Sequence, residues 1–206
     1  METIKIAEQI KKLHNPNRTV IVGIDGLGGA GKSTVSEELY RLLSEENYRV
    51  TILHIDDFIH PKAVRYNDSY AEWECYYNLQ WRYDYLINEV IMPIKRGGDF
   101  NSKIELYDKD NDTYYLSETD IPSGSIVIIE GIFLQREGLR DAFDFMMYID
   151  ISEEVRLERV LERDGYIGDK EQIKAKYNNR YFPAERHYVK ICSPYDKADC
   201  VVRSGE

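Results

Sequence analysis

The feature that most constrains this chain is a glycine-rich turn between a buried strand and a helix. Residues 19–24, TVIVGI, are apolar and mostly β-branched, which is typical of a strand buried on both faces. Helical periodicity covers residues 32–44. The segment between them fits the pattern G-x-x-x-x-G-K-[ST], and it comprises Gly26, Leu27, Gly28, Gly29, Ala30, Gly31, Lys32 and Ser33, with Thr34 following. A strand, this loop and a helix in that order predict a phosphate-binding loop for a nucleotide.

The residue types in the loop explain how it would bind phosphate. Glycines let successive backbone N–H groups turn inward around an anion, because no side chain stands in the way. The helix N-terminus adds its positive potential. Lys32 is positioned to reach the β- and γ-phosphates, and the Ser33 hydroxyl to ligate Mg²⁺. We therefore expect ATP (or GTP) and Mg²⁺ as cofactors.

The same glycines also fit a second nucleotide motif. Gly26, Gly28 and Gly31 match G-x-G-x-x-G of dinucleotide-binding proteins, and the acidic residue Asp56 follows downstream. A dinucleotide site needs neither a lysine nor a hydroxyl at the end of the loop. The Lys32–Ser33 pair therefore favours a phosphate loop over a dinucleotide oxidoreductase.

Two further buried strands lead into carboxylates. Residues 49–55 (RVTILHI) run into Asp56 and Asp57, and residues 125–130 (SIVIIE) end at Glu130. Carboxyl ends of parallel strands meet at one edge of a sheet, so these acids are expected near the phosphate loop. We expect Asp56 to accept a proton from a substrate hydroxyl and Glu130 to hold Mg²⁺ directly or through water. The alternatives are loop solvation for the aspartates and helix capping for Glu130.

The rest of the chain alternates between helix and strand patterns. Helices are expected at 3–13, 153–163 and 170–180, strands at 145–151 and 199–202, a largely helical aromatic stretch at 70–95 and a short strand at 104–107. This alternation predicts an α/β fold with a parallel sheet covered by helices on both faces. We expect one domain over residues 1–206, with residues 1–17 as an N-terminal helical extension.

Charge and composition exclude several classes of partner. The chain has 27 Lys+Arg against 37 Asp+Glu, a net charge of -10, which disfavours nucleic acid or an anionic membrane. The three cysteines, Cys75, Cys192 and Cys200, lack metal-ligand spacing and are expected to be reduced thiols. No signal-peptide pattern and no apolar run of ~20 residues is visible. The expected localisation is cytoplasmic.

Several motifs in a fixed order resemble one family. They are GIDGLGGAGKST (23–34), HIDDF (54–58), IELYD (104–108), VIIEGIFL (127–134), RLERVLERD (156–164) and KADCVV (197–202). Together they resemble the uridine kinase group of P-loop kinases, which is related to phosphoribulokinase, pantothenate kinase and nicotinamide riboside kinase. The resemblance covers about residues 19–202. It implies a P-loop NTPase fold with a helical lid at about 156–180, and transfer of a phosphoryl group to an alcohol.

The resemblance also implies roles for single residues. Asp56 corresponds to the catalytic base, and Arg159 and Arg163 to catalytic lid arginines, whereas Arg156 is expected to be mainly structural. On spacing alone, these arginines would equally suit a surface helix interleaved with glutamates. Tyr107 falls in the substrate-pocket motif.

Departures from the family pattern lie in the acceptor pocket. Asn78 stands where the family has a ribose-binding Asp, and Lys109 and Asp112 stand where it has base-contacting residues. Tyr77, from the aromatic stretch, is the best candidate there for stacking on a base or sugar, although core packing explains most of its neighbours.

The predicted activity is phosphorylation of a small-molecule hydroxyl. The 5′-hydroxyl of a nucleoside, uridine or cytidine first, is the leading acceptor. The alternatives are a kinase for another small metabolite, of the pantothenate or nicotinamide riboside type, and a non-catalytic NTP-binding regulator. The family resemblance is compatible with a homo-oligomer.

Overall fold

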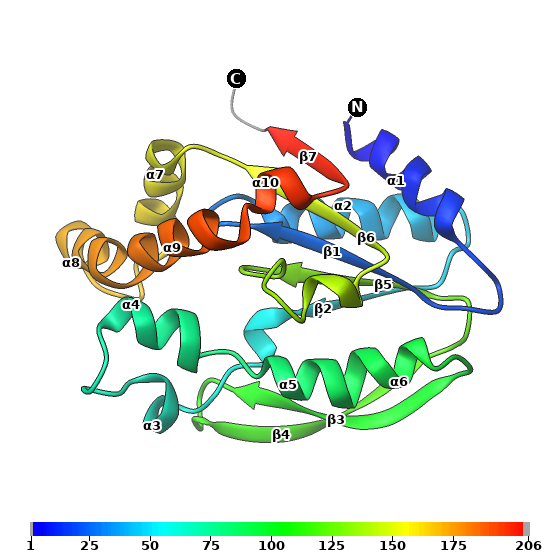
Figure 1. Cartoon of the computed structure of the whole chain (residues 1–206), viewed down its shortest axis with the longest axis horizontal. Helices are drawn as coiled ribbons and strands as arrows, with labels where there is room; N and C mark the ends of the chain where they lie inside the picture. The colour runs from blue at the N-terminus through cyan, green and yellow to red at the C-terminus, as the bar shows by residue number, and fades with distance from the viewer. Residues whose placement is uncertain (1, 204–206) are drawn as a thin grey trace.

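A parallel sheet of five strands runs through the centre of the protein, in the order β2-β5-β1-β6-β7 (Figure 1). The computed structural model describes residues 2–203. The strands are β1 (Val20–Gly26), β2 (Val50–His54), β5 (Ile126–Gly131), β6 (Phe145–Asp150) and β7 (Cys200–Arg203). All neighbours in this sheet pair in parallel. The predicted α/β class is confirmed, and each strand lies within two residues of its expected bounds.

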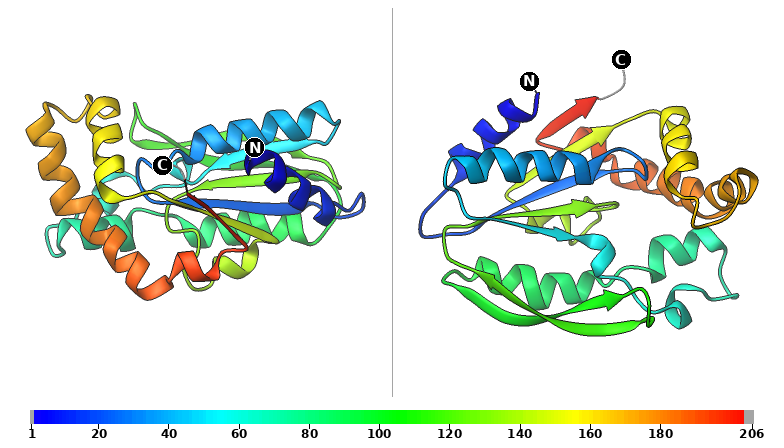
Figure 2. Two further views of the ribbon diagram at one scale, coloured as in Figure 1. Left: turned by 90° about the horizontal axis from the view of Figure 1, so that it is seen from above. Right: turned by 180° about the vertical axis from the view of Figure 1, so that it is seen from behind.

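The sheet is buried on both faces, which explains its continuous apolar sequences. Every residue of β1 and β5 is buried. On one face, α1 (Glu2–Leu13) and α2 (Lys32–Glu45) bury Ile10 and Leu39 in the cluster that contains Val22. The other face carries the helices of residues 83–95 and 182–192 (Figure 2). The N-terminal helix is therefore packed into the core.

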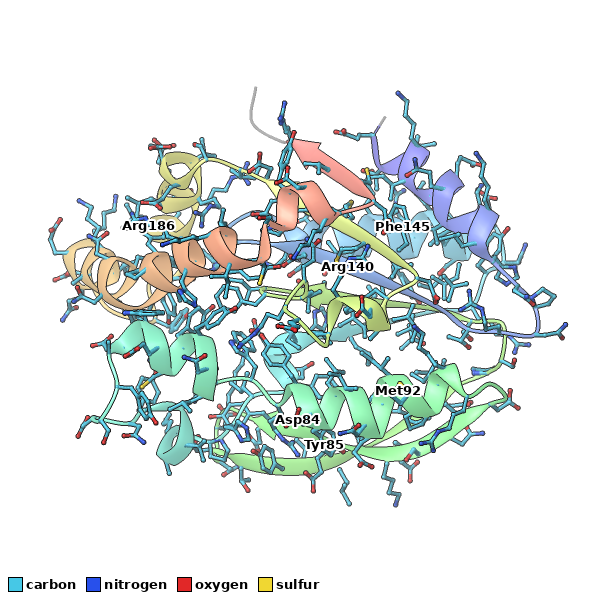
Figure 3. The ribbon with its side chains drawn as sticks, viewed as in Figure 1. Asp84, Tyr85, Met92, Arg140, Phe145 and Arg186 are labelled. Carbon is cyan, nitrogen blue, oxygen red and sulfur yellow. The ribbon has the colours of Figure 1, made fainter. Side chains whose placement is uncertain are left out.

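The aromatic stretch forms two helical segments where the sequence predicts one. The first joins α4 (Glu72–Glu74) to the π-helical η2 (Cys75–Leu79); the second joins α5 (Tyr83–Tyr85), η3 (Leu86–Ile91) and α6 (Met92–Lys95). Between them the chain extends and pairs with residues 58–60. The His60 N–H donates to Gln80 O at 2.8 Å, and the Arg82 N–H donates to Phe58 O at 2.8 Å. On the second segment, Asp84 and Met92 are exposed to solvent (Figure 3).

An antiparallel hairpin lies beneath that second helix (Figures 1 and 2). It pairs β3 (Phe100–Asp108) with β4 (Thr113–Ile121). The sequence predicts only its residues 104–107. β4 escaped prediction because its outer face is exposed, so polar residues interrupt its apolar pattern. The hairpin buries Phe100, Ile104 and Ile121 in the same cluster as Leu86.

The C-terminal third is mostly helical. α7 (Glu153–Arg163) has its predicted bounds, and the N–H of Val155 donates to the Ser152 hydroxyl that caps it. α8 (Lys170–Lys176) continues through the π-helical η5 (Tyr177–Tyr181) into α9 (Phe182–Cys192). This helix is longer than the predicted 170–180, because Pro183 falls in the first turn of α9 and does not end it.

The remaining elements are short. They are η1 (Ile55–Asp57), α3 (Lys62–Arg65), η4 (Arg140–Ala142) and α10 (Pro194–Lys197). Within residues 2–203, no helix combines the length and apolar character needed to cross a membrane.

Candidate active site

The glycine-rich loop leaves the carboxyl end of β1 and enters α2. Gly29 (φ 80°) and Gly31 (φ 92°) adopt left-handed backbone conformations, which the absence of a Cβ permits. Gly31 is the residue before the first turn of α2. The Lys32 ammonium folds back over the loop and donates to Leu27 O at 3.1 Å. The loop therefore has a closed shape with its lysine directed across it.

Ser33, in the first turn of α2, and Glu130, near the carboxyl end of β5, lie in contact with each other. The Ser33 hydroxyl donates to Glu130 Oε1 at 3.1 Å, and His54 Nδ1 lies 2.7 Å from the same oxygen. Burial would raise the pKa of Glu130, but hydrogen bonding by His54 and the charge of Lys32 outweigh it, so this pKa is lowered. Glu130 is held as a carboxylate.

Asp56 lies in the same electrostatic environment. Its side chain is exposed to solvent. Desolvation by the surrounding walls nevertheless raises the pKa of Asp56, Lys32 opposes this rise, and Glu130 adds to it. Burial lowers the pKa of Lys32, while Glu130 and Asp56 raise it. One cation thus faces two carboxylates from different strands, and a carboxylate with a raised pKa suits proton acceptance.

The donor set at Ser33 and Glu130 fits Mg²⁺. Magnesium in nucleotide enzymes is usually held by one or two protein oxygens plus substrate phosphates and water. Among the described residues, no group of three or more His, Cys, Asp or Glu side chains forms a metal site by itself. A hydroxyl and a carboxylate beside a phosphate loop fit a metal that arrives with the nucleotide.

The three arginines of α7 have different environments. Arg159 Nη1 donates to Gly29 O at 3.3 Å, so it contacts the loop. Arg163 Nε instead donates to Asp164 Oδ1 at 2.6 Å, and this hydrogen bond raises the pKa of Arg163. Arg156 is buried and pairs with Glu185 at 2.7 Å. Of the two predicted catalytic arginines, only Arg159 touches the loop in this structure.

Tyr77 and Asn78, which the sequence predicts in the acceptor pocket, lie beside other residues than Asp56 in this structure. The Tyr77 ring packs on Phe133, and its hydroxyl lies 3.8 Å from Cys192 Sγ. Both residues line a cavity of about 770 Å³ that contains no residue of the phosphate loop. The neighbouring Tyr76 packs on Phe133 as well, and also on Trp81 and Tyr181. Burial raises the pKa of Tyr76, and the charge of Asp56 adds to the rise.

Tyr107 is held by residues that the sequence did not associate with it. Its hydroxyl donates to Asp112 Oδ1 at 2.6 Å and accepts from Arg65 Nη2 at 2.8 Å. Asp112 also accepts the Lys62 N–H at the start of α3. The positive charge of Lys109, at the tip of the hairpin, opposes the rise in the pKa of Asp56. The hairpin therefore contributes one charge to the site, and Arg65 and Asp112 together hold the Tyr107 hydroxyl in place.

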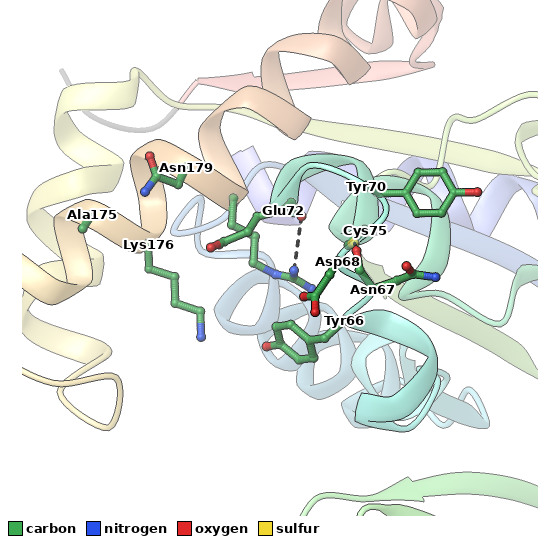
Figure 4. A pocket seen from close by; sticks show the side chains of 10 residues that line it. Tyr66, Asn67, Asp68, Tyr70, Glu72, Cys75, Ala175, Lys176 and Asn179 are labelled. Carbon is green, nitrogen blue, oxygen red and sulfur yellow. Dashed lines mark hydrogen bonds between the residues drawn. The ribbon is translucent and has the colours of Figure 1, made fainter.

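A cavity of about 460 Å³ opens between residues 66–75 and the helix of α8 and η5 (Figure 4). Its inner wall is Arg180, which is 1% exposed and donates to Glu72 O at 3.2 Å and to Gln80 Oε1 at 3.0 Å. The guanidinium stacks over Tyr66 at 4.4 Å and over Tyr76 at 5.4 Å.

Asp25 is a buried residue that sequence reasoning missed. It lies in β1 with no exposure, where it accepts from Tyr188 Oη and, at 3.1 Å, from Gln135 Nε2. The Gly26 N–H, at the start of the loop, donates to its other oxygen at 2.9 Å. The sequence indicates its importance only through an acid inside an otherwise apolar strand, because a buried carboxylate needs hydrogen-bond donors.

Comparisons with known proteins agree with this geometry. The sequence profile of the Phosphoribulokinase / Uridine kinase family matches residues 21–206. A uridine kinase of Clostridium novyi is 30% identical over 159 residues, covering 71% of this chain and 69% of that protein. A uridine kinase of Staphylococcus haemolyticus is 27% identical over 190 residues, covering 91% and 88%. A solved structure described as a possible uridine kinase from Bacillus stearothermophilus superposes with a TM-score of 0.77 at 28% identity, covering 97% and 96%.

Proposed function

Because the chain belongs to the Phosphoribulokinase / Uridine kinase family and is a phosphotransferase with an alcohol acceptor, we propose that it phosphorylates the 5′-hydroxyl of a nucleoside with ATP. The observation that carries the proposal is the convergence of Lys32, Asp56 and Glu130 at the carboxyl edge of the sheet. The names of the bacterial relatives support uridine or cytidine as the first acceptors to test.

The proposed reaction is a direct displacement at the γ-phosphorus. The acceptor oxygen forms a bond to phosphorus as the bond to the β–γ bridging oxygen breaks, and ADP leaves. The hydroxyl proton passes to the Asp56 carboxylate. Lys32 neutralises charge that develops on the transferring group and the bridging oxygen. Arg159, already in contact with the loop, adds a second cation beside it.

Magnesium would be held by the Ser33 hydroxyl and the Glu130 carboxylate. When bound, the ion supplies charge that offsets the negative phosphates. His54 hydrogen-bonds the carboxylate and fixes its orientation, as the outer-shell partners of metal ligands commonly do.

We assign the acceptor to the cavity walled by Arg180. The cavity offers Asp68, Lys176 and Asn179 as polar groups and Tyr66 as an aromatic ring, and its Arg180 lies over the Tyr76 ring at 5.4 Å. Tyr107, fixed by Arg65 and Asp112, would form the adjoining wall. Closure of residues 156–180 over this space would exclude water, which otherwise competes as acceptor.

A second candidate is a kinase for another hydroxyl metabolite, of the pantothenate or nicotinamide riboside type. Lys109 favours it, because a cation acting on both Asp56 and Asp57 stands close to where an acceptor would bind. Such a charge suits an acceptor that carries an anionic group, as pantothenate does. A non-catalytic nucleotide-binding regulator is disfavoured, since it has no need for a base at Asp56.

An acceptor panel tests the proposal. Purified protein with Mg·ATP is given uridine, cytidine, adenosine, pantothenate or nicotinamide riboside, and ADP and phosphorylated product are quantified. Uridine or cytidine should yield ADP and 5′-monophosphate in equal amounts. Lys32→Ala should lower this rate by at least about 10²-fold, because it removes preorganised charge stabilisation, whereas Lys12→Ala on the exposed surface of α1 should not.

The other outcomes are equally informative. Product with pantothenate or nicotinamide riboside alone would establish the second candidate. Nucleotide binding without ADP release for any acceptor would contradict the kinase proposal and favour a regulator.

A further inference from the structure

The backbone N–H and C=O of Gly28, in the phosphate loop, are both hydrogen-bonded by side chains of helices outside the loop. Its N–H donates to Glu185 Oε1 at 2.9 Å, and its carbonyl accepts from Arg156 Nη1 at 3.0 Å. The same Arg156 nitrogen donates to Glu185 Oε2 at 2.7 Å. Arg156 belongs to α7 and Glu185 to α9, so a closed ring of hydrogen bonds joins both helices to one residue of the loop.

This pair is fully buried. The Arg156 and Glu185 side chains are 3% and 2% exposed. Arg156 Nε also donates to Ile151 O at 3.2 Å, so the guanidinium is anchored at the start of its helix. A buried ion pair is often no more stabilising than apolar side chains of similar size, because desolvation offsets the attraction. Its contacts to Gly28 therefore give it a role that two apolar residues could not fill.

The loop requires such an external restraint. Four of its first six residues are glycines, Gly26, Gly28, Gly29 and Gly31, which are the residues with the most backbone freedom. Binding a phosphate in a loop that is not already ordered would cost conformational entropy. α7 restrains the next residue as well, since a Cβ at Gly29 would meet Arg156 O at 3.0 Å.

We propose that Arg156 and Glu185 are positioning residues for the nucleotide: they hold the backbone of Gly28 on both sides and so preorganise the loop whose nucleotide-binding role is proposed above. They also couple the lid helix to that loop. Arg156, which the sequence suggested was mainly structural, would thereby act on nucleotide affinity without touching the nucleotide.

The same two helices provide a matched control. Glu153 of α7 and Arg186 of α9 form a second ion pair, with Arg186 Nε donating to Glu153 Oε2 at 3.2 Å. This pair is exposed, and neither side chain hydrogen-bonds the loop in the structure of residues 2–203. It joins the same helices without the contact to Gly28.

The test is the dissociation constant of Mg·ADP, measured for each variant by titration calorimetry. The free energy of unfolding of each variant is measured in parallel. Glu185→Gln removes the charge that holds the Gly28 N–H and should weaken binding by about 10-fold or more, because hydrogen bonds to charged groups contribute about 1.5–3 kcal/mol. Glu153→Gln should bind within about twofold of wild type. Neither measurement requires an acceptor, so a wrong acceptor assignment does not affect the result.

A double variant separates positioning from stability. Arg156→Met with Glu185→Leu replaces the buried pair by apolar side chains and should retain most of the folding stability. It should still bind Mg·ADP about 10-fold or more weakly, because Gly28 loses both partners. Binding within twofold of wild type, in either Glu185→Gln or the double variant, would overturn the proposal.

Discussion

The hydrogen bond between Glu130 and His54 cannot be predicted from the sequence around either residue. Glu130 is predictable, because an acid ends a buried strand after a phosphate loop. His54 has no partner that the sequence names. Its partner follows from the pairing of β2 with β5, which sets His54 opposite Glu130 across 76 residues of chain. Strand order is a tertiary property, so residues that meet across strands are the part of the site that local patterns miss.

Replacing Glu130 by Gln tests its proposed role at magnesium. The change keeps the side chain's size but removes the negative charge, so the Mg²⁺ concentration for half-maximal rate should rise by about 10-fold or more. Glu137→Gln, on an exposed residue shortly after the same strand, should leave the titration unchanged. If the Mg²⁺ dependence of Glu130→Gln equals that of the wild type, the role at magnesium is contradicted. Glu130 would then serve only as a hydrogen-bond acceptor for Ser33 and His54.

At the scale of elements, β1 and α9 show how a buried strand acquires polar contacts. The five central strands were predicted from their mainly apolar runs, which reflect full burial in β1 and β5. The hairpin and the continuation of α8 into α9 were not. β4 has one exposed face, and Pro183 is compatible with a first helical turn as well as with a helix end. α9 then places Tyr188 against Asp25 of β1, a contact between residues 163 apart.

Tyr188→Phe should weaken the attachment of α9 to β1. The Tyr188 hydroxyl donates to Asp25 and accepts the Gln135 N–H at 3.0 Å, so its loss should lower the free energy of unfolding by about 1–3 kcal/mol. Burial raises the pKa of Asp25, and Tyr188 opposes the rise. The variant's Asp25 therefore has a still higher pKa in the folded state, with its unfolded value unchanged.

The sign of the pH dependence follows from that shift. The cost of Tyr188→Phe is fully present above the folded-state pKa of Asp25 and diminishes as the pH falls through it, because a protonated Asp25 needs the donor less. Urea unfolding of both proteins at a series of pH values measures this. Tyr115→Phe, on an exposed tyrosine of β4, is the control and should cost little at any pH. An equal cost for Tyr188→Phe at every pH would show that Asp25 is not the group responsible.

At the scale of the whole molecule, the parallel arrangement is what gathers the site. Lys32 and Ser33 follow β1, Asp56 follows β2, and Glu130 lies near the end of β5, so three strands deliver their groups to one edge. That convergence was predictable from the sequence once the strands were recognised as parallel. The proposed acceptor side was not, because we assign it to the hairpin, Arg65 and Arg180, whose contacts depend on how separate layers pack.

The central claim is that Asp56 is the base of a kinase centred on this edge. The most direct measurement compares Asp56→Asn with Asp57→Asn for kcat with the best acceptor and for the dissociation constant of Mg·ATP. Asp56→Asn should lower kcat by about 10²–10⁴-fold, the usual contribution of a general base, with nucleotide affinity nearly kept because the loop holds ATP independently. Asp57→Asn should be milder. A larger loss for Asp57→Asn would move the base by one residue, and an unchanged kcat in both variants would contradict a site organised around a hydroxyl acceptor.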